Sequence, residues 1–503
     1  MPSSNKFITD LSLTTFSQIT ITALNISILK ILSNQLPEEG LGIYLIIRRL
    51  VGVAFPVVVL NLNMSLARYI SFEKNKADHY FYYSFILITV VGAAIFLLIS
   101  FTEDLLAEWI FGSGEFAPLL LPMLLFLYSN SFHILCVGFF RGKQNYQIMN
   151  LVEIVFWINA VIPFALFFIE SSNYLDFIYT YFITYAILAF FINLFFVLKS
   201  GNLKLPAEMK SLNKEFWQFY KVEQHFFKYG ASRIPSGFYI GLFFYLPIAA
   251  ATTFFGLKSA AYIGILVAII RMIQLIGMPF NIIFLPKFSS YVAEKNEQMM
   301  LKNSQIILEF LFTLPLLVGF FCSFFSEELI LLWFGAKYQI VVPLLVFTGP
   351  IAGSLVVYVM LRGVLDGYSD YPYVNTITLA ALVANFAGVC IAVYFSTGLW
   401  GLVIAFNIGI LVLGYFSIYF LLKVQKLALL NLKNLAAIGW FLILVAGGYL
   451  YNQFVIFDSL LNALFFKVLL SLLILLTSVF LYWKLKFKWV GEFLARTGID
   501  RPN

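Results

Sequence analysis

Residues 259–285 read SAAYIGILVAIIRMIQLIGMPFNIIFL, an apolar run in which Arg271 is the only charged side chain. A helix of roughly 20 mostly apolar residues is long enough to cross a lipid bilayer. The run therefore predicts a membrane-spanning helix with a guanidinium near its middle. Such a charge costs roughly 2.5–3.5 kcal/mol at the bilayer centre, so it normally faces a wet cavity or a partner.

A second apolar run repeats this arrangement in the first half of the chain. Residues 41–65 read LGIYLIIRRLVGVAFPVVVLNLNMS, with Arg48 eight residues before Pro56, just as Arg271 lies eight residues before Pro279. Two hypotheses follow from the matching arginines. They line a hydrated cavity that accepts an anionic cargo, or they reach an interface or pair with buried acids for structural reasons. The cavity hypothesis is stronger for Arg271, which is predicted nearer mid-membrane.

The whole composition indicates an integral membrane protein. Of 503 residues, 61% are hydrophobic and 11% are charged, and the mean hydropathy is +0.92. Soluble globular proteins carry roughly 25% charged residues. The three cysteines lie in apolar runs and the three histidines are scattered, so no metal site or disulfide framework is predicted.

The apolar runs predict an all-α, polytopic fold with about fourteen transmembrane helices. The expected spans are 9–31, 41–65, 81–101, 116–138, 148–170, 174–198, 229–253, 259–285, 304–325, 340–361, 373–395, 399–422, 434–451 and 461–483. If the N-terminus is cytoplasmic, the inside segments hold 24 of the 32 Lys and Arg residues, and the outside loops hold two. This positive-inside pattern predicts that both termini are cytoplasmic.

Landmarks recur in the same order in both halves, which predicts two pseudo-symmetric six-helix bundles. Trp109-Ile-Phe-Gly matches Trp333-Phe-Gly, and the Arg-Gly pair at 141–142, interpreted as a helix end, matches the pair at 362–363. Glu73-Lys-Asn matches Glu294-Lys-Asn. The predicted domains are a first bundle at 1–198, a cytoplasmic amphipathic linker at 199–228, a second bundle at 229–422, and two extra spans with a basic tail at 423–503.

Further charged residues lie within the predicted spans. Arg49 follows Arg48 but points some 100° around the helix. Arg233 stands among Gly and Pro at the start of the seventh span, where it meets an anion or anchors the helix at the cytoplasmic edge. Glu153 and Glu309 either serve a coupling cation or neutralise the arginines, and the structural role is the commoner one.

Several function classes are excluded or disfavoured. No Gly-rich phosphate loop followed by Lys and Ser or Thr is present, and no soluble segment is large enough for a nucleotide-binding domain. The chain is therefore expected to carry no cofactor, no catalytic residues and no nucleic-acid partner. A membrane glycan polymerase or ligase would need outside catalytic loops, which are short here.

The arrangement resembles a known group of transporters. Its features are six plus six homologous spans, a connector, two extra spans, the stretch Pro37-Glu-Glu-Gly-Leu-Gly-Ile-Tyr44, and Phe140-Arg-Gly-Lys143. The chain is similar to polysaccharide and lipid-linked-oligosaccharide flippases, including O-antigen flippases, of the multidrug/oligosaccharidyl-lipid/polysaccharide exporter superfamily. The resemblance implies a V-shaped pair of bundles around a cationic cavity. It also implies that the extra pair helps to form a groove for a polyprenyl tail.

The same resemblance implies a cargo and a location. Members move an undecaprenyl-pyrophosphate-linked glycan across the bacterial inner membrane, with membrane lipids, a glycan polymerase and glycosyltransferases as partners. In the related lipid II flippase, cavity arginines lie on the first, second and eighth spans. Arg48 or Arg49 and Arg271 match the last two, but the first span offers only Lys30. This favours an O-antigen, capsule or exopolysaccharide unit; the main rival is a drug or cation antiporter of the same superfamily.

Overall fold

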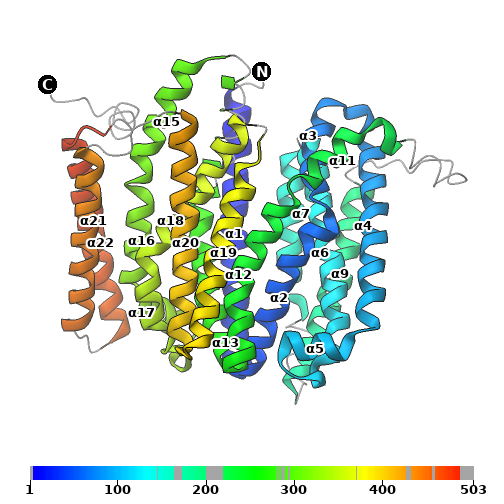
Figure 1. Ribbon diagram of the computed structural model, residues 1–503, viewed down its shortest axis with the longest axis horizontal. Helices are drawn as coiled ribbons and strands as arrows, with labels where there is room; N and C mark the ends of the chain where they lie inside the picture. The colour runs from blue at the N-terminus through cyan, green and yellow to red at the C-terminus, as the bar shows by residue number, and fades with distance from the viewer. Residues whose placement is uncertain are drawn as a thin grey trace, which may run out of the picture. The chain divides into compact units, whose positions relative to one another are not determined.

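The computed structural model describes residues 4–143, 145–163, 173–199, 219–278, 295–369, 371–425, 432–455 and 459–487, with a few single residues between 279 and 294. Every regular element in these ranges is a helix (Figure 1). Thirteen candidate spans in these ranges are long and apolar enough to cross a membrane. In the remaining predicted span, 148–170, α7 ends at Asn159, and residues 164–170 lie outside the described residues. The predicted all-α, polytopic fold class is confirmed.

The chain divides into two compact units, Met1–Gly264 and Ile265–Asn503. In unit 1, α6 packs against α2, α3, α4, α7 and α9, because one long face of it is apolar and aromatic. The helices of unit 1 are α1 Ser4–Gln35, α2 Glu38–Val59, α3 Leu62–Phe72, η1 Lys74–Lys76, α4 Ala77–Ser100, α5 Glu103–Phe111, η2 Gly114–Leu119, α6 Leu120–Gly142, α7 Tyr146–Asn159, α9 Tyr174–Lys199, α11 Gln224–Ala231 and α12 Ile234–Phe255. Helix α13, Leu257–Gln274, crosses the division.

In unit 2, α18 has the role that α6 has in unit 1 and packs against α16, α17, α19 and α20. The helices after α13 are η4 Leu275–Gly277, α15 Glu297–Leu311, α16 Leu314–Phe324, α17 Ser326–Trp333, η5 Ala336–Tyr338, α18 Val341–Tyr368, α19 Tyr373–Tyr394, α20 Gly398–Gln425, α21 Leu432–Phe454 and α22 Leu460–Lys484. Figure 1 shows the appended helices α21 and α22 together, beside α16. The predicted basic tail lies largely outside the described residues.

The two landmark tryptophans mark the same local structure in both units. Each belongs to a short helix, α5 or α17, with two acidic residues in its first turn. Each helix is followed by a glycine with positive φ, Gly112 at 84° and Gly335 at 89°. A 3₁₀ turn and a long helix, α6 or α18, come next. Glycine suits these positions because it adopts positive φ without a steric penalty.

The two Arg-Gly landmarks differ in one respect. Helix α6 ends at Gly142 as expected, but α18 continues past Gly363 to Tyr368, so the second pair does not mark a helix end. Close packing explains both glycines. A Cβ atom at Gly142 would lie 2.6 Å from the carbonyl oxygen of Leu66, and one at Gly363 would lie 2.5 Å from that of Asn281.

The second predicted span is broken rather than continuous. Pro56 lies inside α2, and the helix ends at Val59, because Leu60 and Asn61 adopt left-handed φ values of 51° and 48° before α3 begins. The seventh predicted span is also broken, at Ser232 and Arg233 between α11 and α12. Pro279, the counterpart of Pro56 in the eighth predicted span, lies outside the described residues.

The two breaks lie side by side within unit 1. Ser65 donates its hydroxyl to the carbonyl of Phe226 at 2.8 Å. A Cβ atom at Gly230 would lie 2.7 Å from the carbonyl oxygen of Leu60, and one at Gly241 would lie 2.8 Å from the Cα of Val53. The seventh predicted span therefore packs on α2, and unit 1 extends beyond the predicted bundle boundary at 228/229. Most of the predicted linker, residues 200–218, lies outside the described residues.

Candidate functional site

A polar face of α1 packs against a polar face of α7. Asn150 donates its amide to the hydroxyl of Thr14 at 3.3 Å. Gln18 donates to Oε2 of Glu153 at 2.8 Å. Residues 14 and 18 lie one turn apart on α1, and 150 and 153 lie nearly one turn apart on α7, so each pair shares a face. Polar residues of this kind join helices where water is scarce.

Arg48 lies at one end of this seam and binds neutral groups. Its Nη1 donates to the hydroxyl of Tyr44 at 3.1 Å, and its Nη2 donates to Oδ1 of Asn25 at 3.1 Å. The guanidinium carbon lies 4.9 Å from the ring centroid of Trp157 on α7. Cation–π contact partly replaces the water that a buried guanidinium loses. Among the described residues, no ion pair includes Arg48 or Glu153.

Three buried tyrosines complete the surroundings of Arg48. The ring centroids of Tyr44 and Tyr181 lie 5.8 Å apart, and those of Tyr181 and Tyr185 lie 6.1 Å apart. The phenols of Tyr181 and Tyr185 are close enough to interact electrostatically with Arg48. The buried hydroxyl of Tyr185 has no hydrogen-bond partner in the part of the chain that the structure describes. We call Arg48, Asn25, Tyr44, Trp157, Tyr181 and Tyr185 the Arg48 cluster.

The chemistry of the Arg48 cluster suits an anion. A guanidinium has five N–H donors in a planar fork. Two of them make the described bonds, to Tyr44 and Asn25. Phenol and amide groups add neutral donors that can bind oxygens of a phosphate or a sugar. Because the described partners of Arg48 carry no negative charge, its positive charge can attract an anion.

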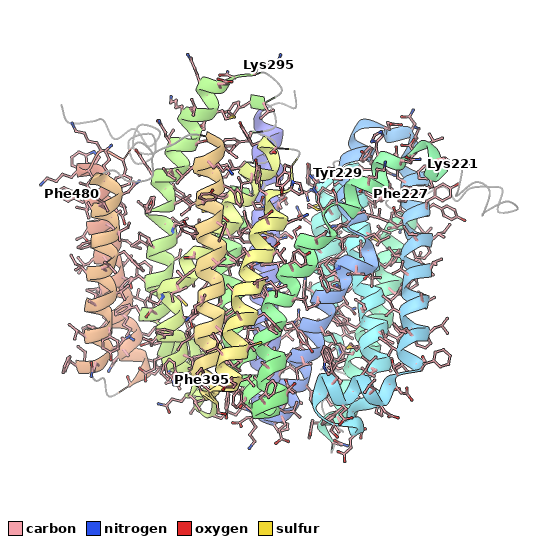
Figure 2. All side chains as sticks on the ribbon, in the orientation of Figure 1. Lys221, Phe227, Tyr229, Lys295, Phe395 and Phe480 are labelled. Carbon is pink, nitrogen blue, oxygen red and sulfur yellow. The ribbon has the colours of Figure 1, made fainter. Side chains whose placement is uncertain are left out.

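The other predicted site residues lie at several places. Arg49 is half-buried on α2, next to Arg48. Arg233 caps the start of α12, stacks its guanidinium 3.9 Å from the ring centroid of Tyr229, and donates to the hydroxyl of Ser232 at 3.3 Å. Figure 2 labels Tyr229 on α11. Arg233 therefore lies at the break between α11 and α12.

Two predicted residues belong to the second half of the chain. Arg271 is half-buried near the end of α13, and Glu309 is buried on α15. The structure thus places Arg48 and Glu153 in the same seam. Trp157, which contacts Arg48, lies one turn from Glu153 on α7. The expected convergence of Arg48 and Arg271 stays a prediction.

Sequence reasoning missed the aromatic members of the cluster. Tyr44 precedes Arg48 by four residues, and Tyr181 precedes Tyr185 by four, so each pair shares a helix face. This spacing was a usable signal. The contact between Trp157 and Arg48 joins helices more than one hundred residues apart, and no local pattern predicts it.

A second polar cluster lies where α4 and α11 begin. Glu223 and Lys76 precede the candidate spans, and Tyr80 lies in the first turn of α4. Glu223 accepts bonds from Nζ of Lys76 and from the hydroxyl of Tyr80, both at 2.8 Å. Burial acts to raise the pKa of Glu223, but these two bonds outweigh it and lower that pKa. The bonds from Lys76 to Glu223 and Glu73 raise the pKa of the lysine. Among the described residues, no group of three His, Cys, Asp or Glu side chains could hold a metal ion.

Comparison with known proteins identifies the fold. No protein-family model matches the chain, and no curated protein sequence matches it. The solved lipid II flippase MurJ in an inward-closed conformation superposes with a TM-score of 0.67 at 15% identity, covering 95% of this chain and 99% of that one. The chain has the fold of the multidrug/oligosaccharidyl-lipid/polysaccharide exporter superfamily.

Two other solved structures belong to the same superfamily. An inward-facing multidrug-resistance transporter of the MATE family superposes with a TM-score of 0.63 at 14% identity, covering 82% of this chain and 99% of that one. A superfamily transporter from Pyrococcus furiosus, described by the reverse polarity of its binding pocket, gives a TM-score of 0.63 at 16% identity and covers 84% and 96%.

Proposed function

We propose that this protein is a flippase that moves an undecaprenyl-pyrophosphate-linked oligosaccharide across the bacterial inner membrane, for O-antigen, capsule or exopolysaccharide synthesis. The observation that carries the proposal is Arg48, a cation held among neutral partners within membrane-spanning helices. A half-buried cation whose described partners are all neutral favours an anionic ligand. A pyrophosphate matches the planar donor fork of arginine.

The other predicted residues have supporting roles in this proposal. Arg271 in the second half binds the same headgroup, and Arg49 and Arg233 attract it at entry. The two halves rock in turn toward each side of the membrane, and no bond is made or broken. Both termini lie in the cytoplasm, in keeping with the distribution of Lys and Arg.

The appended helices support a lipid-linked cargo over a soluble one. The flippase superposes on 95% of this chain, whereas the two transporters above superpose on 82% and 84%. The extra part of this chain that superposes on the flippase is comparable in length to α21 and α22 together. This favours the lipid-linked-glycan exporters over the twelve-span antiporters.

A drug or cation antiporter is the second candidate, and Glu153 favours it. This carboxyl lies in the polar seam and accepts a hydrogen bond from the neutral amide of Gln18. An acid in that position can exchange a proton or cation. Glu309 would be its counterpart in the second half. In the flippase hypothesis, the same acids couple transport to an ion or act as counter-charges.

Reconstitution in proteoliposomes tests the two candidates against each other. We expect the protein to move a fluorescent polyprenyl-pyrophosphate-linked glycan between leaflets and to leave a cationic dye in place. Arg48→Met should slow movement of the glycan by about a hundredfold, whereas Lys484→Met, at an exposed position on α22, should not change it. Movement of the dye that depends on Glu153, with no movement of the glycan, would establish the antiporter instead.

A further inference from the structure

Lys467 is a buried lysine in the membrane helix α22, one of the two appended helices. Its residue is only 3% exposed, although most of the surrounding side chains of α22 face outward (Figure 2 labels the exposed Phe480). A lysine in such a helix is costly in hydrocarbon. Its burial therefore requires partners within the protein.

Each hydrogen-bond donor of Lys467 has an acceptor. Nζ lies 2.8 Å from Oε1 and 2.9 Å from Oε2 of Glu328, and it donates to the carbonyl of Phe324 at 3.0 Å. An ammonium has three donors, so three acceptors match its capacity. Phe324 is the last residue of α16, where the negative end of the helix dipole also favours a cation.

Glu328 belongs to an element that occurs in both units. It lies in the acidic first turn of α17, which corresponds to Glu103 and Asp104 in α5. Those two acids are exposed, whereas Glu328 is 2% exposed. The difference arises because α22 places Lys467 against α17. The appended pair thus uses an acidic turn that the repeated fold already provides.

Apolar contacts align the pair beside this charged contact. Leu444 on α21 packs with Phe320 and Phe324 of α16, and Tyr451 lies 5.4 Å from Phe324 between ring centroids. Asn452 donates to the same Phe324 carbonyl at 3.2 Å. Apolar packing alone allows two apolar helices to slide along each other, whereas a buried ion pair holds them in one relative position.

We propose that Lys467 and Glu328 lock the appended pair onto α16 and α17, so that the pair keeps one position on the second half throughout the conformational cycle. Removing one partner leaves an uncompensated buried charge, and the pair then shifts or separates to reach water. The lock is independent of the cargo, so its test can fail or succeed whatever the protein transports.

Spin-label distance measurements on the full-length protein in lipid nanodiscs test the lock. Labels are placed at Leu332→Cys on α17 and Leu461→Cys on α22, both exposed, after Cys136, Cys322 and Cys390 are replaced by Ser. We expect one narrow distance distribution in the parent protein. Lys467→Met and Glu328→Gln should broaden it, and Lys484→Met on the same helix should leave it unchanged.

The exchanged variant Lys467→Glu/Glu328→Lys separates the lock from general packing. It restores opposite charges, so the narrow distribution should return. Single variants that keep the narrow distribution would overturn the proposal. If the single variants do not accumulate, a folded exchanged variant with a narrow distribution supports it. The proposal is overturned if the exchanged variant does not fold or gives a broad distribution, while Lys467→Met/Glu328→Met folds and gives a narrow one.

Discussion

Arg48 in unit 1 and Lys467 in unit 2 are both cations within membrane-spanning helices, but their surroundings differ. Lys467 faces a carboxylate and a helix-terminal carbonyl that together match all its donors. Arg48 faces a phenol, an amide and an aromatic ring, and the described bonds use two of its five donors. In our proposal, the fold itself completes the surroundings of Lys467, whereas a ligand completes those of Arg48.

The largest expected effect is on stability, when each of the two cations is replaced separately by methionine. Lys467→Met should lower the free energy of unfolding by about 3–5 kcal/mol, because it leaves the Glu328 charge buried and unpaired. Arg48→Met should lower it by less than about 2 kcal/mol, because the partners left behind are neutral. Thermal unfolding of the purified variants measures this contrast. Equal losses would mean that both cations are structural.

The next effect is on transport and separates charge from geometry. Arg48→Lys keeps the positive charge but loses the planar fork and the contact with Trp157. We expect the rate of glycan movement to fall by about tenfold in Arg48→Lys and by about a hundredfold in Arg48→Met, since charge-assisted bonds contribute about 1.5–3 kcal/mol each. Initial rates in proteoliposomes provide the measurement. A fully active Arg48→Met variant would remove the Arg48 cluster from the transport site.

Two neighbouring glycines on α21 sharpen the account of the second unit. A Cβ atom at Gly448 would lie 2.8 Å from the ring of Phe320, whereas one at Gly447 would meet nothing within 4 Å. Gly448→Ala should therefore destabilise the protein by about 1–3 kcal/mol. Gly447→Ala should be neutral or stabilise it by up to about 1 kcal/mol, because alanine favours helix. Thermal unfolding of the two variants reports whether α21 packs closely on α16. Similar effects for both would contradict that packing.

The smallest effect concerns the polar cluster of Glu223, Lys76 and Tyr80. Because the pKa of Glu223 is lowered in the folded protein, its carboxylate stabilises the fold above its usual value of about 4.3 and loses that contribution as pH falls through the lowered pKa. Glu223→Gln should therefore flatten the dependence of the melting temperature on pH below about 5. Parallel pH profiles for the variant and the parent protein would show that Glu223 does not contribute.

The sequence predicted the features that depend on local composition. Apolar runs predicted the spans. The recurrence of Trp109 and Trp333 indicated a repeat, but it did not predict the short helices α5 and α17. The second predicted span breaks at Leu60 and Asn61, shortly after Pro56. Left-handed φ at these two residues is set by tertiary packing, and neither is a glycine that would have signalled it.

The partners of the buried charges could not be predicted in the same way. Lys467 was recognisable as a charge within an apolar run, but Glu328 lies 139 residues away and looked like an ordinary acid in an outside loop. Glu153 was expected either to serve a coupling cation or to neutralise an arginine, and its hydrogen-bond partner Gln18, 135 residues away, was not predicted. Contacts between distant helices depend on packing order, which periodicity does not encode.

The affinity of the protein for a polyprenyl pyrophosphate in nanodiscs, measured for the parent protein and Arg48→Met side by side, tests the central claim most directly. The account predicts saturable binding to the parent protein and at least about tenfold weaker binding to Arg48→Met. Lys484→Met should bind as tightly as the parent protein. Equal affinities for the parent protein and Arg48→Met would contradict the claim that unit 1 holds an arginine for a phosphorylated ligand.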